Sequence, residues 1–344
     1  MNPTALVQKI GSSWPPATWK DVNIGIALSG GADSVALLRS LEEIKQSNGG
    51  SGELFALHVN HHLRGEASDG EQHWCEELCR KLEIPFEALQ GDVARRARKE
   101  GDGIEAAARH ERYALLTQAA ERCGIRYLAF AHTQNDQVET ILFRLLRGTG
   151  IRGIAGMSRV RGLTPTLSLI RPMLSCTRNE ILAYLSEREQ SFCNDQSNTD
   201  SQFVRNRLRN ELLPLLRSNY DEKVDRAILR LSEQALEIQS FLEAEARKLL
   251  SHSLRGSPAD AQNGTTRLKL NIAALANRPE ILIREALRIA WRESGLAEQE
   301  MNFDWWCKLA DLVLSPASNR VLNLPGNVRA QVIENRLHLE WQHS

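Results

Sequence analysis

Residues 29–34 read "SGGADS" and lie between two apolar runs, 24–28 and 35–38. The first run predicts a buried strand and the second predicts the beginning of a helix. Glycines at such a turn let the backbone approach an anion, and the N–H groups of the turn form a concave nest beside the positive end of the helix. The stretch therefore predicts a phosphate-binding loop made of Ser29, Gly30, Gly31, Ala32, Asp33 and Ser34.

The composition of this loop narrows the kind of phosphate chemistry. The loop has neither the Gly-Lys-Ser/Thr of a Walker motif nor the GxGxxG of a dinucleotide-binding motif. Asp33 would repel a phosphate unless a cation lay between them, so we expect Asp33 to be a ligand of Mg²⁺. The alternative is that the two glycines serve only the steric needs of a tight turn.

Strand-like and helical patterns alternate through the first half of the chain. The expected strands are 22–28, 53–60, 84–89 and 126–132, and the expected helices are 32–46, 69–82, 103–123 and 134–147. This order predicts an α/β fold, a doubly wound and mostly parallel sheet with helices on both faces. Ligands bind such sheets at the carboxyl ends of the strands, where "SGGADS" and "AHTQND" (131–136) both fall.

The pattern changes after about residue 220. Apolar residues then recur at steps of three and four up to residue 249, which predicts one long amphipathic helix. A polar stretch, 255–266, reads as a linker, and the rest predicts a small α+β domain with helices near 279–294 and 302–314. We therefore expect a catalytic domain at 1–218, a connecting helix at 219–255 and a C-terminal domain at 256–344.

Composition limits the class of protein. The chain has 344 residues, 42% apolar and 25% charged, with a formal net charge of zero, so a nucleic-acid site would need local segregation of charge. Six scattered cysteines include no CxxC pair, which favours a reduced, cytoplasmic setting. No apolar run reaches membrane-spanning length, and the first residues lack the core of a signal peptide.

Three further segments carry candidate site residues. His58 opens a loop after the second strand, where the alternative is a solvated loop. Arg112 is placed on one helix face with Arg109, either to reach a triphosphate or to form surface ion pairs. His132, Asp136 and Glu139 begin a later helix, either to bind a cation or a substrate amine or, for the two acids, to offset the helix dipole.

Arginines concentrate in one acid-free stretch. Between Thr140 and Asn179 there is no Asp or Glu, and the seven arginines are Arg144, Arg147, Arg152, Arg159, Arg161, Arg171 and Arg178. The stretch predicts a surface for a polyanion. The alternative is neutralisation by acids that follow, such as Glu180, Glu187 and Glu189. Downstream, Arg205 and Arg209 share a helical face.

Taken together, these motifs resemble those of the tRNA(Ile)-lysidine synthetases, which belong to the PP-loop ATP pyrophosphatases. The matching strings run in family order across about 24–216 and are "SGGADSVALL", "HVNHHLRGEASDGE", "GIEAAARHERYALL", "AHTQNDQVETILFRLLRGTGIRGIAGM", "IRPML" and "NDQSNTDSQFVRNRLRNELLP". A later string, "LANRPEILIREALRIAWRESG", resembles the first C-terminal domain of that family.

The resemblance implies a ligase that uses ATP and Mg²⁺. ATP adenylates the C2 oxygen of the wobble cytosine in tRNA(Ile) with a CAU anticodon, and free L-lysine then displaces AMP to form lysidine. It implies catalytic roles for Asp33, Arg112, His132, Asp136 and Glu139. ATP would be held by the loop 29–34 together with His58, Arg112 and His132. The lysine and tRNA substrates would be held by Asp136, Glu139, Arg147, Arg152, Arg205 and Arg209, with the C-terminal domain also binding tRNA.

The chain departs from the family pattern in two places. Thr133 and Asn135 stand where the family usually has one member each of a His-His pair and an Asp-Asp pair, so a role that needs the paired acid falls to Asp136 alone. We also expect the last C-terminal domain of the longest members to be missing. The alternatives are another PP-loop tRNA-modifying enzyme, such as a tRNA thiolase, and a non-catalytic nucleotide-binding protein. The oligomeric state is left open, with a homodimer as one candidate.

Overall fold

The computed structural model describes residues 4–60, 66–91, 104–193, 204–253, 260–262, 265–315 and 320–342. The chain forms two compact units, Met1–Ser232 and Glu233–Ser344. The division between them falls inside the 30-residue helix α11 (Val224–Ser253). The long helix expected from the sequence is therefore present, and it contributes residues to both units.

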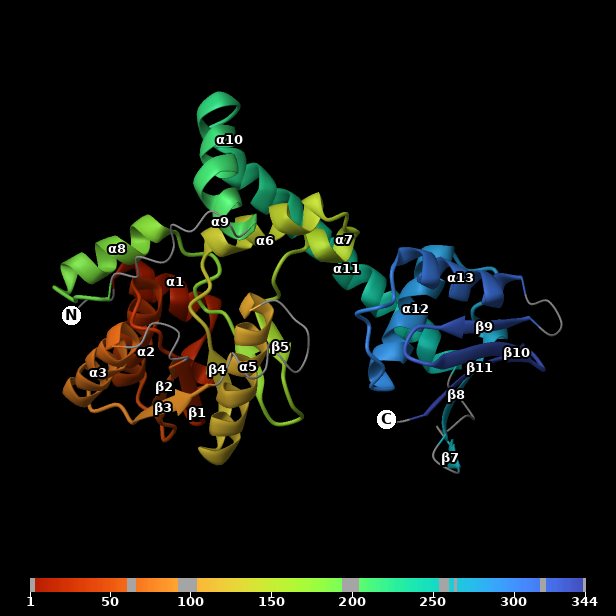
Figure 1. Ribbon diagram of the computed structural model, residues 1–344, viewed down its shortest axis with the longest axis horizontal. Coiled ribbons are helices and arrows are strands. Elements are labelled where there is room, and N and C mark those ends of the chain that lie inside the picture. The colour runs from red at the N-terminus through yellow and green to blue at the C-terminus, as the bar shows by residue number, and fades with distance from the viewer. Residues whose placement is uncertain are drawn as a thin grey trace. The chain divides into compact units, whose positions relative to one another are not determined.

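A six-stranded sheet with the order β3-β2-β1-β4-β6-β5 forms the centre of the N-terminal unit (Figure 1). Its strands are β1 (Asn23–Ala27), β2 (Leu54–Asn60), β3 (Phe86–Gln90), β4 (Ile125–Ala129), β5 (Val160–Gly162) and β6 (Ser168–Ile170). Neighbouring strands run parallel except β5, which pairs antiparallel with β6. The predicted doubly wound, mostly parallel sheet is confirmed.

Helices cover both faces of this sheet. Ile24 and Ile26 of β1 pack on one face with side chains from α1, α2, α3 and α8. On the other face, Leu57 and Leu128 pack with α5. The helices are α1 (Ala5–Ser13), η1 (Pro16–Thr18), α2 (Ala32–Asn48), α3 (Glu66–Lys81), α5 (Ile104–Arg122), α6 (Gln134–Leu146), α7 (Ile151–Ile154) and α8 (Arg178–Glu187). Because successive side chains point to opposite faces of a strand, β1 contributes to the hydrophobic core on each face of the sheet.

The end of the N-terminal unit packs on α6. The elements there are α9 (Val204–Arg207), the π-helical turn η3 (Leu208–Leu212) and α10 (Leu213–Asn219). Val138 and Leu142 of α6 form a small core with Leu213, against which Ile228 at the beginning of α11 also packs. This packing brings the arginines of α9 and η3 beside the acidic end of α6.

An antiparallel sheet with the order β7-β8-β11-β10-β9 forms the C-terminal unit. Its elements are β7 (Asp260–Gln262), β8 (Thr265–Asn271), η4 (Ile272–Ala274), α12 (Glu280–Glu293), α13 (Phe303–Leu314), β9 (Val321–Leu324), β10 (Val328–Ile333) and β11 (Arg336–Gln342). Trp291 and Trp306 meet edge to face in its core. The stretch 255–266 was expected to be a linker, but its second half contains β7, which pairs with β8.

Two further properties bear on the expectations from composition. All six cysteines are free thiols. None of the helices in the described parts of the chain has both the length and the apolarity that crossing a membrane requires.

Candidate active site

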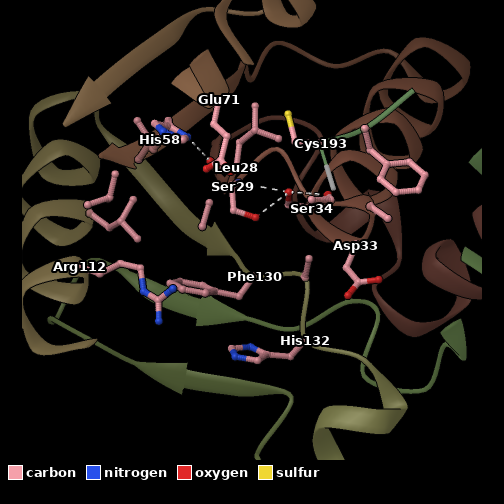
Figure 2. Close-up of a pocket in the computed structure, with 18 of the residues that line it drawn as sticks. Leu28, Ser29, Asp33, Ser34, His58, Glu71, Arg112, Phe130, His132 and Cys193 are labelled. Atoms are coloured by element: carbon pink, nitrogen blue, oxygen red, sulfur yellow. Dashed lines mark hydrogen bonds between the residues drawn. The ribbon is translucent and has the colours of Figure 1, made fainter. Parts of the chain in front are cut away.

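A cavity of about 630 Å³ opens in the N-terminal unit where β1, β2 and β4 end (Figure 2). The strand order reverses at this place, which is where doubly wound sheets bind ligands. Ten of the residues predicted from the sequence line it: Ser29, Gly31, Ala32, Asp33, Ser34, His58, Arg112, His132, Asp136 and Arg209. Segments far apart in the chain thus meet in one cavity.

The loop 29–34 has the geometry of an anion nest. Gly30 has a φ of +84°, a conformation that side chains disfavour. The Ser34 hydroxyl donates to the carbonyl of Gly31 (2.9 Å) and accepts from the amide of Ser29 (3.2 Å), which holds the turn closed. Gly31 is the N-cap of α2 and has no side chain to accept hydrogen bonds from the first N–H groups of the helix. An anion at the cavity wall can accept these hydrogen bonds instead.

Asp33 lies in the first turn of α2 and pairs with the guanidinium of Arg178, the first residue of α8. Burial raises the pKa of the Asp33 carboxyl above its ordinary value, although Arg178 opposes this shift. A carboxylate with a raised pKa inside a cavity is a candidate functional group. A bound cation would stabilise its charged form.

His58 lies within β2 and is only 4% exposed. Its Nδ1 is 2.9 Å from the carbonyl oxygen of Leu28. A carbonyl only accepts, so Nδ1 carries the proton and Nε2 is an acceptor. Burial lowers the pKa of His58, which favours the neutral ring.

His132 follows β4 and lies in the same cavity (Figure 2). Its ring stacks on Phe130 with 5.7 Å between centroids, and Phe130 stacks on Tyr113 at 5.3 Å. The Nε of Arg171 donates to Nδ1 of His132 over 3.2 Å. Burial and the charge of Arg171 lower the pKa of His132 to about 4, so the ring is neutral at pH 7.

Asp136 and Glu139 stand in the first two turns of α6. Thr133 caps this helix, and the Asp136 carboxylate accepts from the amide of Thr133 (2.7 Å) in return. Glu139 is 7% exposed and accepts two hydrogen bonds from Arg209, at 2.6 and 3.0 Å. Arg209 also lies 3.4 Å from the second carboxylate oxygen of Asp136. Burial raises the pKa of Glu139, although Arg209 opposes the shift.

Five predicted residues do not line the cavity. Gly30 is adjacent to the wall in the chain, and Glu139 lies behind Arg209. Arg147 and Arg205 stack on the ring of Phe143 of α6, at 4.7 and 5.4 Å, and Arg152 is half-buried on α7. Arg205 and Arg209 thus share a face, as predicted, and both contact α6 one turn apart.

The acid-free stretch is not one continuous polyanion surface. Arg144 donates to the carbonyls of Gly153 (3.2 Å) and Gly156 (2.6 Å) and so holds the glycine-rich loop. Arg171 is 4% exposed and donates to the carbonyl of Ser158 (2.7 Å). Together with Arg178, these arginines serve contacts inside the unit, because folding turns their side chains toward carbonyls and a carboxylate.

Several residues of the cavity were not predicted as site residues. Phe130, Phe192 and Cys193 line it, and the amide of Cys193 donates to the carbonyl of Gly30 over 3.0 Å. Other lining residues carried a sequence signal without being predicted as site residues: Arg178 belongs to the arginine-rich stretch, and Asn60, Ser68 and Glu71 belong to the string 58–71. The remaining part of the loop after His58 (61–65) and the acidic turn with its continuation (194–203) lie outside the described residues.

Comparison with known proteins identifies relatives that share one name. The tRNA(Ile)-lysidine synthase of Porphyromonas gingivalis (strain ATCC BAA-308 / W83) is 40% identical over 216 residues, which cover 63% of this chain and 45% of the relative. That of Geobacter sulfurreducens is 37% identical over 309 residues, which cover 88% of this chain and 62% of the relative. The chain therefore spans about half to two thirds of the length of these relatives. The resemblance predicted from the motifs is confirmed.

A solved structure and a family model agree on the fold. The U34-tRNA thiolase NcsA from Methanococcus maripaludis, with its [4Fe-4S] cluster, has a TM-score of 0.56 at 16% identity, covering 67% of this chain and 78% of that chain. The family model of the PP-loop domain matches residues 5–216. Because this match spans every element that builds the cavity, from β1 to η3, the chain belongs to the PP-loop domain family.

Proposed function

We propose that this chain ligates free L-lysine to C2 of the wobble cytosine of tRNA(Ile) with a CAU anticodon, with ATP as the activating substrate. The names of the relatives support the reaction. The observation that carries the proposal is that one cavity joins an anion nest, at Ser29–Ser34, to an acidic cluster in which Asp136 lines the wall and Glu139 lies behind Arg209. The nest suits the phosphates of ATP, and the acids suit the amine of lysine.

In the first step, the C2 oxygen of cytosine attacks the α-phosphorus of ATP. The bond between the α- and β-phosphates breaks, and pyrophosphate leaves. The backbone N–H groups of the loop 29–34 and the N-terminus of α2 would hold the leaving pyrophosphate. Arg112 and Arg178 both line the cavity and would offset the negative charge that accumulates there.

The donor set suits Mg²⁺ bound through phosphates rather than enclosed by protein. In the described parts of the chain, no three His, Cys, Asp or Glu side chains gather as metal ligands do. Mg²⁺ in ATP sites is typically held by one or two carboxylates together with phosphate oxygens. Asp33 is the carboxylate inside the nest and would hold the ion, which when bound neutralises phosphate charge.

In the second step, the ε-amine of lysine attacks C2 and AMP leaves. The amine must lose a proton before it attacks, so a carboxylate within reach would clamp the ammonium and accept its proton. Asp136 and Glu139 together with Arg209 carry a formal charge of −1, because two acids surround one guanidinium. One ammonium would neutralise this cluster.

The tRNA surface in this proposal lies next to the cavity, on α6, α7 and α9. Arg147 and Arg205 both stack on the ring of Phe143 of α6, and Arg152 lies on α7. Arginines near exposed apolar side chains, here Leu146, suit the phosphates and unstacked bases of an anticodon loop. The C-terminal domain, 256–344, would supply a second tRNA contact.

Arg152→Glu is expected to weaken tRNA binding and to flatten its salt dependence. Each lost phosphate contact reduces the slope of log K against log salt by about 0.7–0.9. Binding of ATP to the free protein should hardly change, because the nest consists of backbone groups. Filter binding from low to physiological salt measures the slope. A matched control is Arg122→Glu, in the last turn of α5, where we expect no change in the salt slope.

If Arg152 instead serves an internal contact, its replacement would lower the melting temperature and leave the salt slope unchanged. Thermal melting of the same samples separates the two roles. That second pattern would contradict a tRNA contact at Arg152.

The proposed reaction is tested most directly by mass spectrometry of nucleosides. A CAU-anticodon tRNA is incubated with the protein, ATP and lysine, and the digest is searched for lysidine. Omitting ATP, lysine or tRNA in turn, with pyrophosphate as a second readout, separates the alternatives. A tRNA thiolase would ignore lysine, and a non-catalytic nucleotide-binding protein would release no pyrophosphate.

A further inference from the structure

Two histidines line the cavity, and each has a partner on Nδ1 of the opposite kind. His58 meets a carbonyl oxygen, that of Leu28, which can only accept. His132 meets the Nε–H of Arg171, which can only donate. In a neutral imidazole the proton on one nitrogen fixes the role of the other, so these two contacts set the rings as opposite tautomers.

We infer that Arg171 is a positioning residue that fixes His132 as the tautomer with its proton on Nε2, so that the ring presents a neutral hydrogen-bond donor to the cavity. A proton on Nδ1 would point at the N–H of Arg171, and the contact at 3.2 Å would be lost. Among the described residues, none bonds Nε2 of His132, which leaves this N–H for a ligand.

Arg171 is built to hold this position. It is 4% exposed, and a second nitrogen of its guanidinium donates to the carbonyl of Ser158 over 2.7 Å. The His132 ring is held from another side by its stack on Phe130, at an interplanar angle of 11°. A hydrogen bond and a ring stack together leave the imidazole little freedom to turn.

The charges around His132 favour the neutral ring. Arg171 faces it from the segment after β6, Arg109 and Arg112 face it from α5, and Asp136 faces it from α6. Three guanidiniums against one carboxylate disfavour an imidazolium, in addition to burial. His132 is therefore suited to donate a hydrogen bond throughout the reaction rather than to transfer a proton.

This inference rests on the proposed function only for the identity of the acceptor. In the adenylation step, negative charge develops on the oxygens of the α-phosphate, where a neutral donor on the cavity wall stabilises it. The tautomer itself is a property of the free protein and is measured without any substrate.

Nitrogen NMR of the full chain labelled with ¹⁵N-histidine tests the tautomer directly. His132→Gln identifies the signals of His132 among the nine histidines. We expect an unprotonated Nδ1 and a protonated Nε2, with no titration between pH 5.5 and 8, because the pKa of His132 is about 4. A proton on Nδ1, or an imidazolium at pH 6, would overturn the inference.

Two variants of Arg171 test the cause. Arg171→Met is expected to mix the tautomers of His132 and to move its pKa toward the ordinary value of about 6.5. Arg171→Lys keeps the charge and a donor, so it should restore part of the single tautomer. Arg159→Met is the matched control, because it removes an arginine that contacts Ser13 and does not face His132. An unchanged spectrum in a folded Arg171→Met would contradict the role of Arg171.

Activity gives an independent readout. Arg171→Met should lower kcat for pyrophosphate release by about 10-fold to 100-fold, since a misplaced group costs this much, and should leave KM for ATP nearly unchanged. His132→Gln keeps an N–H at the place of Nε2 and should retain more activity than His132→Asn. Equal losses in these two would contradict the donor role. If the expected spectrum is found but no lysidine forms, the proposed function fails and the tautomer assignment stands.

Discussion

Asp33→Ala is expected to reduce ATP-dependent pyrophosphate release by about 100-fold to 1000-fold, the usual cost of losing one group that stabilises charge in the transition state. Asp33 is the one acid inside the nest 29–34. Without a cation between them, it would repel a bound phosphate. Burial in the cavity disfavours the charged carboxylate and so raises the pKa of Asp33. Release of pyrophosphate with tRNA, ATP and Mg²⁺ measures the effect.

The fold should survive this replacement. Asp33 contributes to stability through the helix dipole, about 0.3–1 kcal/mol, and through a partly exposed pair with Arg178, about 0–1 kcal/mol. The melting temperature should therefore change far less than the rate. Asp21→Ala, at an exposed acid before β1, is the matched control and should retain full activity.

Arg178→Met separates two roles for Asp33. If Asp33 served only to hold Arg178, removing either partner would reduce the rate equally. We expect a smaller loss in Arg178→Met, because the metal ligand remains. Normal pyrophosphate release in Asp33→Ala would contradict both the nest assignment and the metal ligand.

The sheet could be predicted because its signals are local. The apolar run before "SGGADS", the alternation of strands and helices, and the glycine-rich turn each depend on neighbouring residues. The β7–β8 hairpin was missed because β7 has only three residues, two of them polar, and lies between turn formers, so its pairing with β8 gives it strand structure that its own sequence does not indicate.

The cavity could be predicted only in part. The loop 29–34, His58, His132 and Asp136 lie at strand ends, and the topology of a parallel sheet gathers such residues. The partners Arg178, Arg171 and Cys193 could not be paired from the sequence, because Asp33 and Arg178 are 145 residues apart and nothing local marks their contact. The family resemblance supplied roles for single residues but not these contacts.

Thr133 illustrates how structure gives meaning to a departure from the family pattern. Its hydroxyl accepts from the amide of Asp136, and the Asp136 carboxylate accepts from the amide of Thr133, which is a capping box. One oxygen of Asp136 is therefore committed to the cap. The other lies toward Arg209, so in this chain Asp136 combines a structural role with its proposed role toward lysine.

Glu139→Gln is expected to impair lysine transfer while adenylated tRNA still forms. The glutamine keeps the shape of the side chain but removes the charge that accepts two hydrogen bonds from Arg209. In the proposed complex the same carboxylate also accepts a hydrogen bond from the lysine ammonium, and such a bond to a charged group contributes about 1.5–3 kcal/mol, so the apparent affinity for lysine should fall by about 10-fold to 100-fold. Single-turnover assays that follow pyrophosphate and lysidine separately measure the two steps.

The pH dependence should change in the same variant. The active form of Glu139 is the carboxylate, and burial raises its pKa, so lysine transfer in the unaltered protein should fall as pH drops through a value above the ordinary 4.5. Glu139→Gln has no such group, so this part of the pH profile should disappear. Glu211→Gln, at an exposed acid on η3 that contacts Arg207, is the matched control and should leave the profile intact.

Asp136→Asn and Arg209→Met distinguish an amine site from a site that only holds the arginine. Asp136, Glu139 and Arg209 carry a formal charge of −1, which one lysine ammonium neutralises; Asp136→Asn brings the cluster to zero, and Arg209→Met brings it to −2. If the acids clamp the ammonium, affinity for lysine should fall in Asp136→Asn, and Arg209→Met should bind lysine at least as tightly because a competing cation is gone. If the acids serve only to position Arg209, then Asp136→Asn, Glu139→Gln and Arg209→Met should all lose both adenylation and lysine transfer. Loss of adenylation in Asp136→Asn and Glu139→Gln would then move these acids from lysine binding to the ATP step.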